Sequence, residues 1–170
     1  MTVATSAPGI EGVRWSNFGR VAAVVAIVVL LSDELLKAFV RAALPVCDVY
    51  HLTDCAHLNL VGPLSLVRAD NAGSAFGYAQ GWGVWVLLAA VGVLLIPLYA
   101  RKLRTVGTLG AAAAGLQAGG ALGNLLDRLV LGGATDMLTL GPGLVWNIAD
   151  IALAIGTVLA SVLLAKTLTR

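Results

Sequence analysis

The sequence predicts an all-α polytopic membrane protein with four transmembrane helices, both termini in the cytoplasm, and a small extracytoplasmic β element between the first two helices. The chain of 170 residues is 59% hydrophobic and 12% charged, with a mean hydropathy of +0.91, which leaves too few polar residues to cover a soluble domain. Its apolar residues gather in long runs, and its basic residues stand at the ends of those runs. That placement, with a net charge of only +2, argues against a nucleic-acid partner.

Four apolar segments can each cross a bilayer, which takes roughly 20 residues of helix. We expect a single membrane domain over residues 1–170, with helices at about residues 21–43, 82–100, 107–131 and 147–165. Basic residues precede the first segment, as they do in a cleavable signal peptide. Its apolar run is interrupted by Asp33, Glu34 and Lys37, however, and bulky residues stand before Cys47 where a cleavage site needs small ones. We therefore interpret this segment as an uncleaved first helix.

The basic residues also predict the orientation of the chain, because short cytoplasmic loops retain Lys and Arg. If four helices alternate across the membrane, one side carries seven basic residues and one acid, and the other carries four basic residues and eight acids. We expect the first side to be cytoplasmic and to hold both termini. Four aspartates then lie at or near the outer ends of the helices and converge on one face: Asp33, Asp127, Asp136 and Asp150.

The segment at about residues 45–80 is too long for a simple connection between two helices. It contains the alternating stretch HLNLVGPLSLVRA, and turn-forming residues lie at Gly62, Pro63, Asn71 and Gly73. This pattern predicts the small β element, which we expect on the outer surface of the membrane.

Small residues recur at every fourth position along the third expected helix. Positions 107, 111, 115, 119 and 123 are Gly, Ala, Gly, Gly and Gly, and the next step of four reaches Asp127. Such a row allows neighbouring helix backbones to approach closely. The adjacent row contains Gly120, Asn124 and Arg128, so the tight packing ends in a polar cluster. We favour buried ion pairs that fix the helix ends as the role of Asp127 and Arg128, while Asn124 can equally satisfy backbone groups or contact a substrate.

Asp33 and Lys37 are four residues apart on the first helix and share one of its faces, which predicts an ion pair. Ionisable residues are costly inside a membrane, so each one counts as a candidate for function. We favour the interpretation that this pair braces a site without taking part in its chemistry.

Asp136 and Asp150 are the stronger candidates for chemistry. Asp150 lies about one turn into the fourth helix on the same face as Asn147, and glycines around Asp136 allow the chain to bend back. The two carboxylates can therefore meet. In a site of low dielectric constant they share a proton, so that one activates water while the other polarises a scissile carbonyl group. This is the chemistry of an aspartic peptidase, although paired carboxylates in membranes also serve proton relays and ion sites.

Two other functions fit parts of the pattern. A small proton- or ion-coupled membrane carrier could use Asp33, Asp127 and Asp150 as a relay, but the helix below Asp150 offers only Thr157 and Ser161 as polar steps. A purely structural helix-packing protein explains the small residues of the third helix but gives no account of the acids.

Five motifs run through the chain in order: Asp33 with Lys37, NAGSAFG at 71–77, GGALGNLLDR at 119–128, GGATDM at 132–137 and WNIAD at 146–150. With these motifs, essentially the whole chain resembles bacterial lipoprotein signal peptidase, also called signal peptidase II, an integral membrane aspartic peptidase. The resemblance implies that Asp136 and Asp150 form the catalytic dyad. It also implies that five further residues line or support the site: Asn71, Asn124, Asp127, Arg128 and Asn147.

The resemblance implies a substrate as well: a diacylglyceryl-modified prolipoprotein, cut on the N-terminal side of its lipidated Cys. It implies a multi-pass protein of the bacterial cytoplasmic (inner) membrane with its active site near the outer face. Membrane lipids are the other expected partners, and we expect a monomer with no metal ion and no cofactor. Met137 and Trp146 stand where the family usually has Phe, so we expect an altered pocket shape rather than lost chemistry. Ser74 stands where Ala is common, which is a small change.

Cys47 and Cys55 do not belong to the family's pattern. On the outer face they can form a disulfide that closes a short loop, which is the favoured interpretation. Together with His51 and His57 they also form a C-x3-H-x3-C-x-H pattern, which is a possible zinc site but lacks the usual paired spacing. Neither arrangement is needed for aspartic peptidase chemistry.

Overall fold

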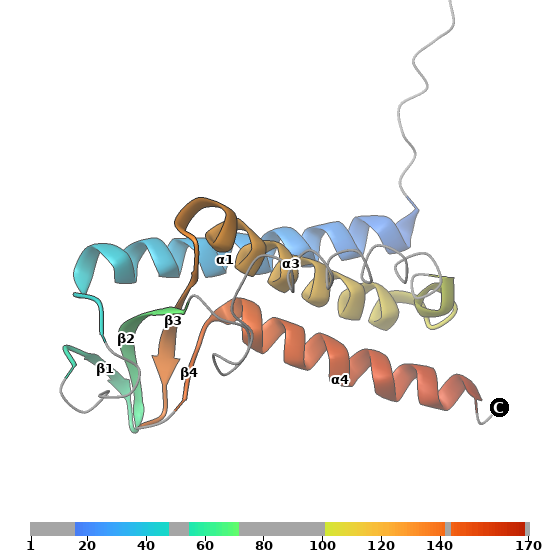
Figure 1. The fold of residues 1–170 in the computed structure, drawn as a ribbon. Coiled ribbons are helices and arrows are strands. Elements are labelled where there is room, and N and C mark those ends of the chain that lie inside the picture. Colours follow the sequence, from blue (N-terminus) through green and yellow to red (C-terminus); the bar gives the residue numbers. More distant parts are fainter. Residues whose placement is uncertain (1–15, 48–54, 72–100, 142–143, 169–170) are drawn as a thin grey trace, which may run out of the picture.

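The protein is described here by a computed structural model that covers residues 16–47, 55–71, 101–141 and 144–168. These residues include three helices: α1 (Asn17–Ala43), α3 (Gly107–Leu131) and α4 (Ile148–Leu168). Figure 1 shows the helices running alongside one another, with a small sheet at one end. α3 packs against both α1 and α4, which contact each other much less. Among the described helices, the one that both others pack against is therefore α3, which is rich in small residues.

The expected helices are found with small differences at their ends. The helix expected at 107–131 is confirmed at both ends. α1 begins at Asn17, four residues earlier than expected, because Ser16 caps it by accepting a hydrogen bond from the N–H of Gly19 at 3.2 Å. α4 begins one residue later and ends three residues later than expected. The helix expected at 82–100 lies outside the described residues.

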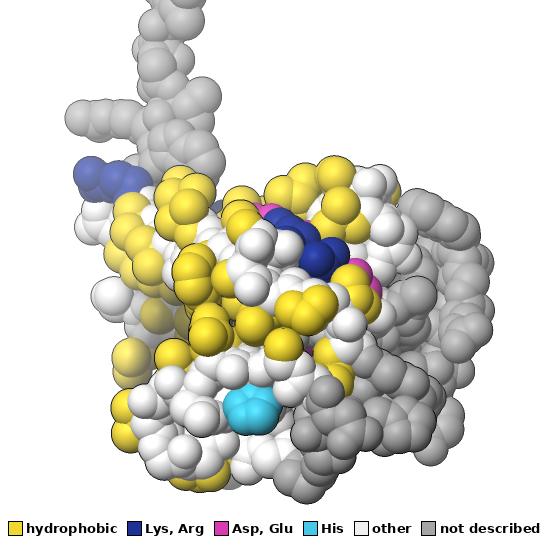
Figure 2. Space-filling model, turned by 90° about the vertical axis from the view of Figure 1, so that its left-hand side faces the viewer, with side chains coloured by type: hydrophobic (Ala, Val, Ile, Leu, Met, Phe, Trp, Pro, Cys, Tyr) yellow, Lys and Arg dark blue, Asp and Glu magenta, His cyan; other side chains and the backbone are white. Residues whose placement is uncertain are grey.

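Apolar surface is widespread on the described helices. By length and composition, the segment Ile148–Thr167 is the one among them that can cross a bilayer, with a mean hydropathy of 2.3. Charged residues within α1 and α3 lower the apolarity of those helices, yet both expose large hydrophobic side chains such as Leu35 and Val130, each 70% exposed. Figure 2, viewed from the end that carries the sheet, shows hydrophobic side chains spread over the surface and a small group of basic side chains beside acidic ones. The number of crossings and their orientation stay predictions.

The sheet combines strands from two distant parts of the chain. Its four antiparallel strands lie in the order β1 (Leu58–Val61), β2 (Leu64–Asn71), β3 (Ala134–Thr139) and β4 (Val145–Trp146). β1 and β2 confirm the β element expected within residues 45–80, with Gly62 and Pro63 at the turn between them. β3 and β4 lie in the connection from α3 to α4, where the sequence predicts that the chain bends back and predicts no strand. These strands are short and form by pairing, β3 with β2 and β4 with β3, so they leave no hydrophobic periodicity in the sequence.

Glycines on α3 determine how closely it approaches α1. A Cβ atom added at Gly115 would lie 2.6 Å from the carbonyl oxygen of Ala22, and one added at Gly119 would lie 2.6 Å from that of Ala26. Real Cβ atoms are not found so near a backbone oxygen, so these positions require glycine. This confirms the close helix packing expected from the row of small residues.

A disulfide joins Cys47 to Cys55. The main-chain N–H of Cys47 donates a hydrogen bond to the carbonyl oxygen of Arg68 on β2 at 2.7 Å, and the disulfide packs beside Val67 and Val145. The bridge therefore attaches the segment after α1 to the sheet. Since the two sulfurs are bonded to each other, neither is available as a thiolate ligand for zinc, and the disulfide alternative is the correct one.

Candidate active site

Asn147 caps α4 and lies at the centre of a group of polar side chains. Its side-chain oxygen accepts the main-chain N–H of Asp150 at 2.7 Å, and its own N–H points back to Asp150 Oδ2 at 3.4 Å. This reciprocal arrangement is a capping box, which satisfies N–H groups at the start of a helix. The local sequence therefore fixes Asp150 in the first turn of α4, with its carboxylate next to the cap.

The amide nitrogen of Asn147 connects the two aspartates. It donates to Asp136 Oδ1 at 2.7 Å and to Asn124 Oδ1 at 2.9 Å. The amide nitrogen of Asn124 in turn donates to Asp150 Oδ1 at 2.7 Å. Asn147 is fully buried, so both of its polar atoms are used inside the protein. The structure thus brings Asp136 and Asp150 into one hydrogen-bonded cluster, as the sequence predicts.

Asp136 enters this cluster from the sheet. It lies on β3, where the register pairs Asn71 of β2 with Ala134, so Asn71 and Asp136 are diagonal neighbours on paired strands. The Asn71 amide donates to Asp136 Oδ2 at 3.0 Å. Burial raises the pKa of Asp136 from 3.8 to about 6, and the negative charge of Asp150 adds to this rise, while the two amide donors and the charge of Lys37 oppose it.

A second cluster, the ionic cluster, lies beside the first and consists of Asp33, Lys37 and Asp127. The Lys37 ammonium is 2.6 Å from Asp33 Oδ2 and 3.0 Å from Asp127 Oδ2. All three side chains are buried. The expected Asp33–Lys37 pair is therefore confirmed, and Asp127 forms the kind of buried ion pair that the sequence suggests. Arg128 is partly buried and donates to the carbonyl oxygen of Asn124 at 2.9 Å, which supports the turn that carries this amide.

Arg41 and Thr135 are polar residues of this region that the sequence analysis misses. Arg41 Nη1 donates to Asp127 Oδ1 at 3.0 Å and to Thr135 Oγ1 at 3.2 Å. Arg41 continues the row of Asp33 and Lys37 by one more step of four along α1, and this spacing was the available signal. Thr135 directly precedes Asp136 but has no such pattern, because its place depends on the pairing of β3.

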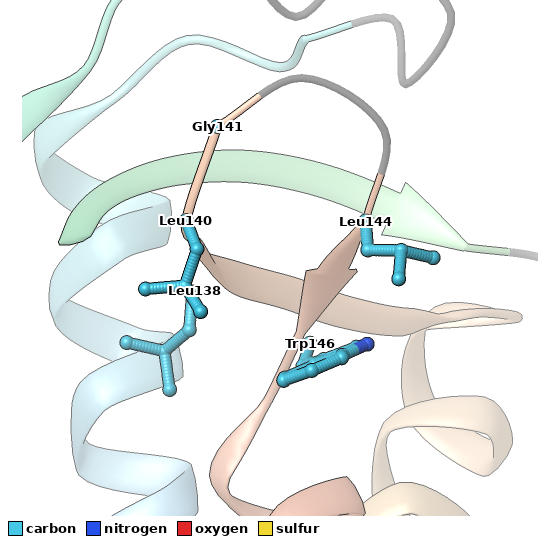
Figure 3. Close-up of a pocket in the computed structure, with 5 residues that line it drawn as sticks. All are labelled: Leu138, Leu140, Gly141, Leu144 and Trp146. Atoms are coloured by element: carbon cyan, nitrogen blue, oxygen red, sulfur yellow. The ribbon is translucent and has the colours of Figure 1, made fainter. Parts of the chain in front are cut away.

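An apolar pocket of about 240 Å³ lies beside the sheet. Its lining consists of Leu138, Leu140, Gly141, Leu144 and Trp146. Figure 3 shows Leu138 and Leu140 on one side of the pocket, with Leu144 and Trp146 on the other. Trp146 directly precedes Asn147, so one short segment contributes to both the pocket and the polar cluster. Met137 is instead buried against Val40, Leu44 and Leu66.

The raised pKa of Asp136 predicts how stability depends on pH. Between the unfolded pKa of 3.8 and the folded value of about 6, the folded state keeps a proton that the unfolded state has released, so the contribution of Asp136 to the free energy of unfolding falls as pH rises. Wild type should therefore lose up to about 3 kcal/mol relative to Asp136→Asn between roughly pH 4 and pH 7. Thermal unfolding of the two proteins across this range checks the difference. Parallel stability curves would contradict it.

Comparison with solved structures identifies the fold of the chain. Two bacterial membrane enzymes determined by the in meso method match the chain with TM-scores of 0.66 and 0.60, both at 21% identity. The first match covers 85% of this chain and 87% of that enzyme, and the second covers 83% and 90%. The chain therefore has the fold of a bacterial membrane enzyme.

The chain belongs to the signal peptidase II family. The pattern of the family described as Signal peptidase (SPase) II matches residues 25–166. The lipoprotein signal peptidase of Burkholderia thailandensis is 32% identical over 143 residues, which cover 79% of this chain and 81% of that protein. That of Syntrophomonas wolfei is 32% identical over 137 residues, which cover 81% and 87%.

Membership of this family confirms the resemblance seen in the sequence. The protein is a protease that removes signal peptides from prolipoproteins. The carrier and the purely structural protein are therefore not needed to account for its acidic residues.

Proposed function

We propose that this signal peptidase hydrolyses its substrate with Asp136 and Asp150 as an aspartic dyad, supported by Asn71, Asn124 and Asn147. The observation that carries the proposal is the bridge made by Asn147. Its amide nitrogen lies 2.7 Å from Asp136 Oδ1, and its amide oxygen accepts the N–H of Asp150 at 2.7 Å. One buried side chain thus ties a carboxylate on a strand to the main chain of Asp150 on a helix, and this placement of the two residues suits acid and base catalysis by the pair.

The reaction requires one ionised and one protonated carboxyl group. The ionised group takes a proton from water while the water oxygen attacks the scissile carbonyl carbon. The protonated group donates a hydrogen bond to the carbonyl oxygen, and a proton passes to the leaving nitrogen as the C–N bond breaks. The pKa of about 6 favours Asp136 as the holder of the shared proton.

We propose diacylglyceryl-modified prolipoproteins as the substrates, cut on the N-terminal side of the lipidated Cys. The relatives named lipoprotein signal peptidase support this assignment. The apolar pocket beside Trp146 also supports it, because such a surface suits a substrate that carries apolar groups.

We further propose that residues 1–170 form one multi-pass domain with four crossings, acting as a monomer in the lipid of the bacterial cytoplasmic membrane, with both termini inside and the site near the outer face. The asymmetry of basic residues supports this orientation. The Cys47–Cys55 disulfide supports it independently, because disulfides persist on the oxidising side of that membrane.

The test uses the full-length protein with two precursors of identical sequence, one with and one without diacylglycerol on the Cys. We expect cleavage of the lipidated precursor only, and mass spectrometry should identify a product that begins with the lipidated Cys. Equal cleavage of both precursors, or cleavage at another bond, would overturn the proposed substrate class.

A further inference from the structure

The buried Lys37 ammonium is shared by carboxylates from two helices. Asp33 of α1 contacts it through Oδ2 at 2.6 Å, and Asp127 of α3 contacts it through Oδ2 at 3.0 Å. Arg41 holds the other oxygen of Asp127 at 3.0 Å. The ionic cluster therefore has few orientations available to its two carboxylates.

Each of these carboxylates also binds a main-chain N–H beside a proposed catalytic residue. Asp33 Oδ1 accepts the N–H of Ala149 at 2.9 Å, and Ala149 directly precedes Asp150. Asp127 Oδ2 accepts the N–H of Thr135 at 2.8 Å, and Thr135 directly precedes Asp136. Both hydrogen bonds are buried. Each carboxylate thus binds the residue directly before a proposed catalytic aspartate, one at the start of α4 and the other on the strand β3.

The packing around Asp33 leaves space for this carboxylate and little else. A Cβ atom at Gly123 would lie 2.7 Å from Asp33 Oδ2 and 3.4 Å from the Cβ of Ala149. The absence of a side chain at this position lets the carboxylate reach the first turn of α4. Asp33 is therefore fixed by its ammonium partner, by its N–H donor and by the adjacent helix.

We propose that the ionic cluster positions the catalytic dyad. Lys37 orients the carboxylates of Asp33 and Asp127. These carboxylates hold the main-chain N–H groups directly before Asp150 and Asp136, so that the two catalytic groups meet. The inference rests on the proposed dyad. Asp33, Lys37 and Asp127 act as positioning residues, since they reach the reacting groups through the backbone. A shift of about 1 Å between reacting groups costs on the order of 100-fold in rate, so small changes at these contacts should appear in kcat.

Paired double variants isolate the hydrogen bond from the charge. Asp33→Asn/Lys37→Met removes one charge of each sign but keeps a side-chain oxygen for the N–H of Ala149. Asp33→Leu/Lys37→Met makes the same charge change and removes that oxygen. We expect the Asn variant to lose up to about 10-fold in kcat, because Lys37 no longer orients its amide oxygen, and the Leu variant, which has no such oxygen, to fall on the order of 100-fold with KM nearly unchanged. Thermal midpoints measured on both variants distinguish this effect from a loss of folded protein.

Equal kcat values for the two folded double variants would overturn the inference, and so would a loss of more than about 100-fold in a folded Asn variant. The second result can be measured even if the Leu variant does not fold. Asp127→Asn/Lys37→Met and Asp127→Leu/Lys37→Met repeat the comparison for the N–H of Thr135. Asp150→Asn serves as the reference for the dyad: full activity of this single variant would refute the proposed function, whereas an inactive Asp150→Asn with equal double variants would refute the positioning role alone.

Discussion

Asp136→Asn and Asp150→Asn should each lower the rate of precursor cleavage by three to four orders of magnitude, roughly the contribution expected of acid and base groups that act as a unit. An amide can neither take a proton from water nor give one to the leaving nitrogen, although its size is nearly that of the carboxyl group. The measurement is single-turnover cleavage of a lipidated precursor by each purified variant. Normal turnover by either variant would rule out the dyad.

The matched control for this experiment is Asp70→Asn. Asp70 precedes Asn71 on the same strand, is 44% exposed and pairs with Arg68 at 3.4 Å, so it undergoes the same chemical change outside the polar cluster. Cleavage by this variant should remain within about twofold of wild type, because exposed ion pairs contribute little to stability. A large loss in the control would mean that neutralising any acid near the sheet impairs the enzyme.

Asn147→Ser should give the second large effect, a loss on the order of 100-fold in kcat with the helix still capped. Serine caps helices as well as asparagine does, so α4 should keep its start. The serine side chain is too short to donate to Asp136 and to Asn124. The variant therefore lacks the two hydrogen bonds of 2.7 and 2.9 Å that connect the aspartates. A misplacement of about 1 Å between the carboxyl groups accounts for an effect of this size. Steady-state kinetics should show the loss in kcat rather than in KM.

Ser16→Ala provides the comparison for Asn147→Ser. This change removes the Ser16 hydroxyl, which caps α1 by accepting the N–H of Gly19. It should lower the free energy of unfolding by about 1 kcal/mol without changing kcat. If Asn147→Ser lowered only the thermal midpoint, as this control should, Asn147 would be a helix cap and nothing more.

The parts of the fold that depend on local pattern could be predicted from the sequence. Length and apolarity identify helices, and a separation of four residues identifies the Asp33–Lys37 pair. The capping box at the start of α4 is equally local, since Asn147 and Asp150 are three residues apart. If successive helices cross the membrane in alternating directions, the four aspartates of the site lie near the same face. This prediction needs no knowledge of individual contacts.

The remaining parts depend on pairing between distant segments. The Asn71–Asp136 hydrogen bond joins residues 65 positions apart and exists only in the register that β2 and β3 adopt. Thr135 comes to lie beside Arg41 for the same reason. The spacing of Cys47 and Cys55 suits both a disulfide and a set of metal ligands. Only the three-dimensional structure, in which the two sulfurs are bonded, distinguishes the two. Sequence spacing alone carries no information about which register or which sulfur partner is chosen.

The hydrogen bond from Ala149 to Asp33 has a consequence for the biosynthesis of the protein. It ties α4 to α1, across 116 positions. With the proposed dyad, a growing chain that ends before α4 and its cap already contains Asp33 and Asn124, but it lacks both Asp150 and the Asn147 amide that holds Asp136. Proteolytic activity would arise in a single step, when α4 docks against α3 and α1. A truncated or stalled chain would therefore cleave no other protein in the membrane.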